Sequence, residues 1–194
     1  MPRVGRRLAA VVLAAAALAA CAGPATPQRP MATAPSPAIG TIPAEQSYVP
    51  VTTADGSATV AVPRGWTRTA GGASLLLTSG FDSVAIDTAV ETDPPTVKST
   101  LDDVLPTLRA INDNFVPGDV RTVDTPAGPA VLCSYNADSQ PGLTPGPRVT
   151  LSFERYELWR LGHDVVLTLS SPAGVDNTAA WHTIVDSVRW RDLG

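Results

Sequence analysis

The chain has little charge, few aromatic residues and almost no lysine. Of its 194 residues, 16% are charged and 5% are aromatic, and the single lysine is Lys98. After residue 21 the chain carries eleven basic and eighteen acidic residues, a net charge of −7. Those basic residues are scattered, with no run beyond Arg189 and Arg191, so the cationic patch that binds nucleic acid is missing. The sequence therefore excludes a nucleic-acid-binding protein.

Long apolar runs are also rare. The one that occurs, Leu8–Leu18, is short for a bilayer span, which excludes a polytopic membrane protein. It follows Arg3, Arg6 and Arg7 and precedes small residues, which is the order of regions in a secretory signal peptide. Residues 1–20 are therefore predicted to be a signal peptide that directs the chain out of the cytoplasm.

A four-residue box ends this segment. Leu18-Ala19-Ala20-Cys21 resembles the lipobox of bacterial lipoproteins, with an aliphatic residue, two small residues and the cysteine in order. In that family the cysteine thiol becomes a diacylglyceryl thioether and the leader is cut just before it. The resemblance implies that Cys21 is the lipidation site and anchors an extracytoplasmic protein to the cell membrane. The alternative is an ordinary signal peptide with a chance cysteine at the cut.

The next segment, residues 22–46, has the composition of a linker. It contains six prolines among Ala, Thr and Ser, and only Arg29 and Glu45 are charged. Such a stretch does not bury a core, so residues 21–46 are interpreted as the lipidated cysteine and a Pro/Ala/Thr-rich tether. One domain over residues 47–194 accounts for the remainder.

Lipidation of Cys21 leaves Cys133 without a partner. Cys133 lies in the apolar, strand-like run Pro129–Tyr135, where cysteine usually acts as a small buried hydrophobe. The alternative, a nucleophile, needs a base and an electropositive setting, and the nearest histidine in the sequence, His163, lies thirty residues away. We therefore predict a buried, reduced thiol.

Period-two alternation dominates the domain and predicts antiparallel strands. The predicted strands cover residues 58–62, 74–78, 84–91, 119–124, 130–135, 148–160, 165–170 and 188–191, with a tight turn at 161–164. In the third strand Val84, Ile86 and Val90 share one face, and the opposite face is expected to be solvated.

Two segments change to helical spacing. An amphipathic helix with a kink or restart at Pro106 is predicted to begin at Thr92-Asp93-Pro94-Pro95, and its apolar stripe is Val97, Leu101, Val104, Leu105, Leu108 and Ile111. A second helix, capped by Asp176 or Asn177, carries Ala180, Ile184, Val185 and Val188 on one side. The fold class is therefore α+β: an antiparallel sheet packed by a central helix and a C-terminal helix.

A family resemblance agrees with this order of elements. With Val62-Pro63-Arg64-Gly65-Trp66 closing the first strand and Ile184-Val185-Asp186-Ser187-Val188-Arg189-Trp190 closing the chain, the sequence resembles actinobacterial lipoproteins of the LpqN/LpqT type. Their fold is similar to that of PsbP, the extrinsic photosystem II protein. The resemblance spans lipobox, tether and domain. It implies a PsbP-like domain with a binding or assembly role in a mycobacterial-type envelope, and it carries over no catalytic residue and no cofactor.

The sequence offers no recognisable catalytic motif. His163 and His182 are nineteen residues apart, one in a turn and one in a helix, with Asp164 beside the first, and no metal site is predicted. G-x-S-x-G, Walker and dinucleotide-binding glycine motifs are missing from the sequence, and Ser74 lacks the strand–turn–helix setting of a nucleophile. The protein is therefore predicted not to be an enzyme.

The remaining candidate residues have structural explanations. Asp102, Asp103 and Asp113 are expected on a solvated helix face rather than in acid–base catalysis. Most aromatic residues are expected in the core, and these are Trp66, Tyr135, Tyr156, Trp159, Trp181 and Trp190.

Three functional hypotheses remain open. The first is a non-enzymatic envelope lipoprotein that binds a protein or a glycolipid. The second is a hydrolase or transferase with an unrecognised site, which a His163–Asp or His182–Asp pair facing a serine would favour. The third is a lipid carrier. For the first hypothesis, the Pro/Gly-rich loop at 139–147, with Gln140, Leu143 and Pro145, is the candidate partner contact.

Overall fold

The computed structural model describes residues 39–140 and 147–192. The predicted signal peptide and Cys21 lie outside the described residues, as do Leu143 and Pro145. Within the described part the strands are β1 (Tyr48–Thr52), β2 (Ala58–Pro63), β3 (Thr67–Gly71), β4 (Ser74–Ser79), β5 (Asp82–Val90), β6 (Val116–Thr125), β7 (Gly128–Asp138), β8 (Thr150–Arg160), β9 (His163–Pro172) and β10 (Arg189–Trp190). The helical segments are α1 (Val97–Ser99), the π-helical turn η1 (Thr100–Val104), α2 (Leu105–Ile111) and α3 (Thr178–Val185).

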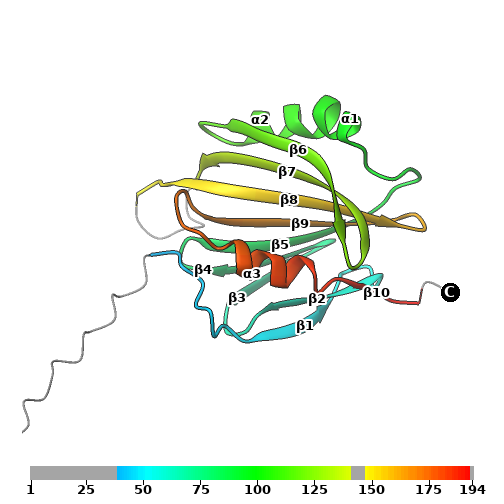
Figure 1. Cartoon of the computed structure of the whole chain (residues 1–194), viewed down its shortest axis with the longest axis horizontal. Coiled ribbons are helices and arrows are strands. Elements are labelled where there is room, and N and C mark those ends of the chain that lie inside the picture. Colours follow the sequence, from blue (N-terminus) through cyan, green and yellow to red (C-terminus); the bar gives the residue numbers. More distant parts are fainter. Residues whose placement is uncertain (1–38, 141–146, 193–194) are drawn as a thin grey trace, which may run out of the picture. The chain divides into compact units, whose positions relative to one another are not determined.

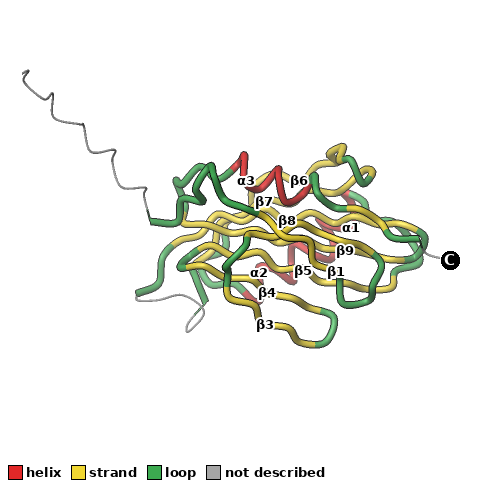
Figure 2. The backbone as a smooth tube through the Cα atoms, turned by 90° about the horizontal axis from the view of Figure 1, so that it is seen from below, coloured by secondary structure: helices red, strands yellow, loops and turns green. Residues whose placement is uncertain are grey.

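These strands form two antiparallel sheets (Figure 1). The larger has seven strands in the order β3-β4-β5-β9-β8-β7-β6, and the smaller has three in the order β1-β2-β10. In Figure 2, β3 and β4 form the outermost strands at one edge of the domain. The predicted fold class, an antiparallel α+β domain with a central and a C-terminal helix, is confirmed.

The main core lies between the two sheets and α3. One face of the large sheet supplies Leu77, Val84, Ile86, Leu158, Val165, Leu167 and Leu169, and the small sheet and α3 supply Val60, Val62, Trp181, Ile184 and Val185. Period-two alternation places these apolar residues on one face of each strand. The opposite face of the large sheet does not contribute to this core.

Most predicted elements are present, with corrections at their ends. The strands β2, β4, β5, β7 and β8 and the helix α3 lie where the patterns predict them. The strands β1 and β3 were missed: β3 (Thr67–Gly71) is exposed along its whole length and therefore shows no alternation. The β8–β9 turn is tighter than expected, with its left-handed residues at Leu161 and Gly162, so His163 lies in β9.

The central helix begins later than predicted. Its N-cap is Thr96, whose hydroxyl accepts from the Ser99 N–H while Ser99 Oγ accepts from the Thr96 N–H, rather than a residue before Pro94. The restart near Pro106 is confirmed, because the π-helical turn η1 ends at Val104 and Pro106 lies in the first turn of α2.

The packed domain begins before residue 47, the boundary predicted from the sequence. Ile42 is buried in the main core, and its backbone N–H donates to Asn177 Oδ1 at 2.9 Å. The end of the predicted tether is therefore packed against α3. Among the described residues, no helix has the length and hydropathy needed to cross a membrane.

Candidate functional site

The site is a trough on the face of the large sheet opposite the main core. Two rows of cross-strand neighbours form its floor. One row is Leu76, Ala85, Thr168 and Arg155, and the next is Thr78, Ser83, Ser170, Phe153 and Tyr135. Because paired residues in adjacent strands point to the same face, both rows face away from the main core. The floor combines apolar, hydroxyl and aromatic side chains, whereas a fully solvated face was expected for the third predicted strand.

The helix α2 covers one side of this trough. Leu108, Ile111 and Asn112 line it from above the sheet, and the cavity measures about 330 Å³. None of the residues in α2 is buried, and Ile111 is 63% exposed. The apolar stripe of the central helix therefore packs on the sheet only in part and leaves a hydrophobic rim over the cavity.

An aromatic stack holds α2 against β7 and β8. The Tyr135 ring stacks on Phe153 with centroids 4.6 Å apart and lies 5.1 Å from Phe115, which follows α2. The Arg109 guanidinium lies 5.9 Å from the centroid of the Phe115 ring. Burial raises the pKa of Tyr135 to about 12, so its phenol stays protonated and neutral. Tyr135 and Phe153 of this cluster line the trough.

The one cation among the lining residues is already paired. Arg155 Nε donates to Glu157 Oε1 at 3.0 Å, and the two side chains are 19% and 8% exposed. Asp164 lies on the same face, and burial together with the nearby Glu157 charge raises its pKa to about 6. Asp87, which faces the trough from β5, accepts from Ser74 Oγ. The polar part of the floor therefore offers no uncompensated positive charge to an anion.

Hydroxyl groups line the other polar part of the floor. Ser83 Oγ and Ser170 Oγ are 2.7 Å apart, and Thr78 and Thr168 are their neighbours in the two floor rows. These groups can exchange hydrogen bonds with a neutral polar ligand beside the apolar part of the cavity.

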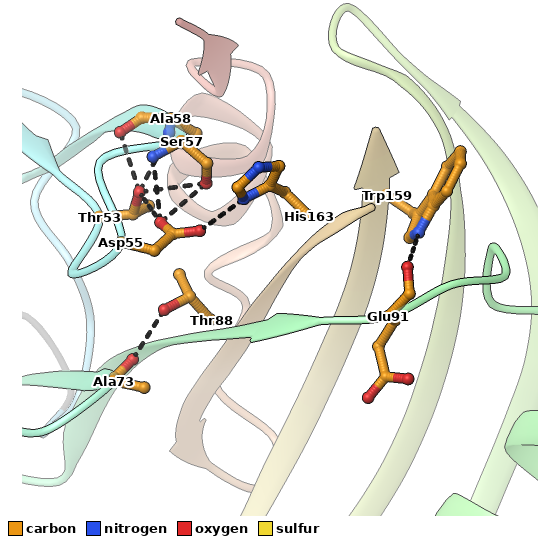
Figure 3. A network of polar contacts seen from close by, with 9 residues as sticks. All are labelled: Thr53, Asp55, Ser57, Ala58, Ala73, Thr88, Glu91, Trp159 and His163. Atoms are coloured by element: carbon orange, nitrogen blue, oxygen red, sulfur yellow. Dashed lines mark hydrogen bonds and ion pairs between the residues drawn. The ribbon is translucent and has the colours of Figure 1, made fainter. Parts of the chain in front are cut away.

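A second polar network lies between the two sheets and includes a histidine–aspartate pair (Figure 3). His163 Nδ1 lies 3.1 Å from Asp55 Oδ2, and Ser57 Oγ donates to Asp55 Oδ1 at 2.8 Å. Burial would raise the pKa of Asp55, but hydrogen bonds from Ser57, Thr53 and His163 outweigh it and hold the pKa at about 2.

This network does not have the order of a catalytic triad. In a triad the serine hydroxyl donates to the histidine, whereas here the serine donates to the carboxylate. Ser57 is also 1% exposed, so substrate does not reach its hydroxyl. The arrangement is that of an Asx turn that closes the β1–β2 hairpin and ties it to His163 of β9.

The other sequence candidates lie apart from one another. Gln140 borders the trough, while Asp102, Asp103 and Asp113 are exposed, and Asp102 and Asp113 pair with Lys98 and Arg148. His182 is exposed on α3, far in sequence from His163. In residues 39–140 and 147–192, no group of three metal-ligating side chains is close enough to hold an ion.

Sequence reasoning missed the trough because its residues are spread over five strands and a helix. The available signal was the second face of β5, where Ser83, Ala85 and Ala89 are uncharged and only Asp87 carries a charge. The prediction of a buried thiol at Cys133 is confirmed. Cys133 is 1% exposed, is not in a disulfide, and belongs to a cluster against which Leu105 and Leu108 of α2 pack.

Comparison with known proteins identifies the fold. No protein-family model matches the chain, and no curated protein matches it. Among solved structures, cyanobacterial PsbP from Synechocystis sp. PCC 6803 is 11% identical, with a TM-score of 0.58 over 79% of this chain and 99% of that chain. The fold is PsbP-like.

A Saccharomyces cerevisiae protein has a similar structure. The Ran-binding protein Mog1p is 14% identical, with a TM-score of 0.51 over 74% of this chain and 95% of that chain. Both identities are low, so these matches show the PsbP-like fold and no more than the fold.

Proposed function

We propose that this protein is a lipid-anchored lipoprotein of the cell envelope, of the LpqN/LpqT type, and that it acts by binding rather than by catalysis. Cys21 is the anchor in this proposal, and residues 22–39 are the tether that separates it from the domain. The proposed ligand is an envelope glycolipid, whose apolar chain occupies the trough.

The observation that carries this proposal is the composition of the trough. Leu76, Leu108 and Ile111 provide an apolar path, while Ser83, Ser170 and Thr168 provide hydroxyl groups beside it. Its volume of about 330 Å³ lies within the usual range for small-ligand sites, about 300–1,000 Å³. An uncharged, hydroxyl-bearing head group with an apolar chain matches both parts, and the pairing of Arg155 with Glu157 disfavours an anionic one.

A protein partner is the second candidate. It is favoured by Ile111, which is 63% exposed at the rim of the trough, and by the Ran-binding role of the similarly folded Mog1p. In that case Gln140, Leu143 and Pro145 are the proposed contact residues of the loop that follows β7.

The proposal is tested by filling the trough. Ala85→Leu places a larger side chain on its floor, and Ala89→Leu makes the same change on the same face of β5 outside the trough. The tagged full-length chains are extracted from envelope membranes, and co-purifying lipids and proteins are identified by mass spectrometry. We expect one glycolipid class to co-purify with the wild type and Ala89→Leu and to be lost with Ala85→Leu. Equal recovery with all three chains would reject the trough as the binding site.

A further inference from the structure

A second recess lies on the opposite face of the large sheet, beside α3. Its walls are formed by Ser134 and Asn136 of β7, Ser152 and Glu154 of β8, Trp181 of α3 and the start of β6 at Val116–Gly118. It encloses about 210 Å³. The four residues of β7 and β8 lie on the core-facing side of the sheet, so this recess is separate from the trough.

A β-bulge fixes one wall of the recess. The register between β6 and β7 shifts between Pro117 and Val120. A Cβ atom at Gly118 would lie 2.5 Å from Ser134 Oγ and 2.8 Å from Ser134 O, so only glycine fits. The Asp119 N–H donates to Ser134 Oγ at 2.8 Å, which fixes the bulge against β7. Bulges of this kind commonly occur where a strand is shaped around a site.

Polar groups around this recess keep free hydrogen-bonding capacity. Within the described residues, the side chains of Asn136 and Ser152 make no hydrogen bond to another group. Trp181 is 6% exposed, and its buried Nε1–H has no acceptor in the described structure. Because that nitrogen is buried, Trp181 lines the recess with its ring and offers no donor to it.

The charge in the recess is negative and unpaired. Glu154 Oε2 accepts from the Tyr156 hydroxyl at 2.6 Å, but no cationic nitrogen lies within 4.0 Å of it in residues 39–140 and 147–192. Arg121, the nearby cation, pairs with Asp119. Burial and the Glu154 contact raise the pKa of Tyr156, so the phenol remains a donor to this carboxylate. The Glu154 carboxylate thus keeps lone pairs for a further donor.

We propose that this recess is a second binding site that takes a primary ammonium group. The ammonium donates to Glu154 and to the Asn136 and Ser152 oxygens, beside the Trp181 side chain that lines the recess. A lysine side chain of a partner protein and a free small amine both have this chemistry. The acidic character of the chain after residue 21 favours either cation over an anion.

The test uses the full-length chain and two amine probes, Nα-acetyl-lysine methylamide and ethanolamine. Tryptophan indole N–H signals are followed by ¹⁵N NMR. Because the chain has four tryptophans, the Trp181 signal is assigned as the one that disappears in Trp181→Phe. We expect both probes to shift the Trp181 signal selectively, with weaker binding at high salt. Tighter binding of the lysine probe assigns the site to a partner protein, and equal binding assigns it to free amines.

A charge variant and a neutral probe complete the test. Glu154→Gln is expected to weaken probe binding about tenfold, because it replaces a charge-assisted hydrogen bond by a neutral one. Asp103→Asn, which makes the same charge change on the exposed helix, leaves it unchanged. The neutral probe Nα,Nε-diacetyl-lysine methylamide is expected not to bind. If it shifts the Trp181 signal as strongly as the amines, or if Glu154→Gln binds them as the wild type does, the proposal is wrong. Because the trough variant Ala85→Leu retains this site, failure here is distinguishable from failure of the trough proposal.

Discussion

Asn177 and Asp82 lie 95 positions apart in the sequence, yet the Asn177 side-chain amide donates to Asp82 Oδ1 at 3.3 Å. The same amide donates to the Gly40 carbonyl at 2.7 Å, and its oxygen accepts from the Ile42 N–H. One side chain at the start of α3 therefore joins the beginning of β5 to the segment that leaves the tether. Gly40 is required there, since its φ is +86° and a Cβ would lie 2.4 Å from Pro172.

Asn177→Ala is expected to lower the free energy of unfolding by about 3 kcal/mol, because buried groups of Asp82 and Ile42 lose their partner. Urea unfolding measures this change. The matched control is Gln46→Ala, whose amide donates to the Ser47 and Arg64 carbonyls at an exposed site and whose loss should change the stability by about 0.5 kcal/mol or less. Equal effects of the two substitutions would contradict the role assigned to Asn177.

Stability is expected to fall as the pH rises from about 4 to about 8. Burial raises the pKa of Asp82 to about 7, and burial and Glu157 raise that of Asp164 to about 6. In the unfolded chain both titrate near 3.9, so between these values the folded state holds more protons and loses stability as they leave. The Asp55 carboxylate acts oppositely: its stabilisation is present above pH about 4 and is lost as the pH falls toward 2.

Asp82→Asn tests the alkaline side of this profile. Relative to the wild type it should gain stability on the order of 2 kcal/mol at pH 8 and little at pH 4, measured by urea unfolding at each pH. Asp103→Asn, which alters an exposed carboxylate, should leave the pH profile unchanged. Parallel profiles for the wild type and Asp82→Asn would show that Asp82 titrates normally.

Cys133 is expected to be protected from thiol reagents in the folded protein. The side chain is 1% exposed, so a reagent does not reach the sulfur. Burial also raises the pKa of the thiol, so the reactive thiolate does not form. The envelope-extracted protein should show one reactive thiol after denaturation and almost none before it. Two thiols after denaturation would mean that Cys21 is not lipidated.

Cys21→Ser is expected to release the protein from the membrane or to block its processing, since the thioether needs the thiol. Membrane fractionation and the mass of the N-terminal peptide measure this. Cys133→Ser is the control, because it removes a thiol without touching the proposed anchor. Unchanged membrane association of Cys21→Ser, with no lipid mass on the wild-type peptide, would reject the lipoprotein interpretation.

The sequence predicts the fold well for strands and helices that have one face in the core and the other in solvent. Val84 and Ile86 alternate with polar residues because their strand has one face in the main core, and the helix α3 shows its stripe for the same reason. The edge strand Thr67–Gly71 was missed because neither of its faces is buried. The cap at Thr96 was missed because prolines 94 and 95 precede it and resemble a helix start.

The two candidate sites could not be predicted in the same way. The trough brings Leu76, Phe153 and Ile111 together from three distant segments, and no local pattern records that contact. The recess depends on a register shift at Gly118, which alternation in β6 does not reveal because most of that strand is exposed. A His163–Asp pair was named as a possibility, but the identity of its aspartate, Asp55, and the order of its hydrogen bonds needed the structure.

The pairing of early strands with late ones also determines how this chain folds. β5 lies between β4 and β9, and β2 lies between β1 and β10, so each sheet joins residues near position 60–90 to residues beyond 160. Such contacts of high sequence separation slow folding, because a long loop must close before they form. While the chain emerges, β2 pairs with β1 and β5 with β4, but the other edge of each strand stays unpaired until β10 and β9 are made. Truncation near the C-terminus should therefore leave an aggregation-prone chain rather than a smaller folded domain.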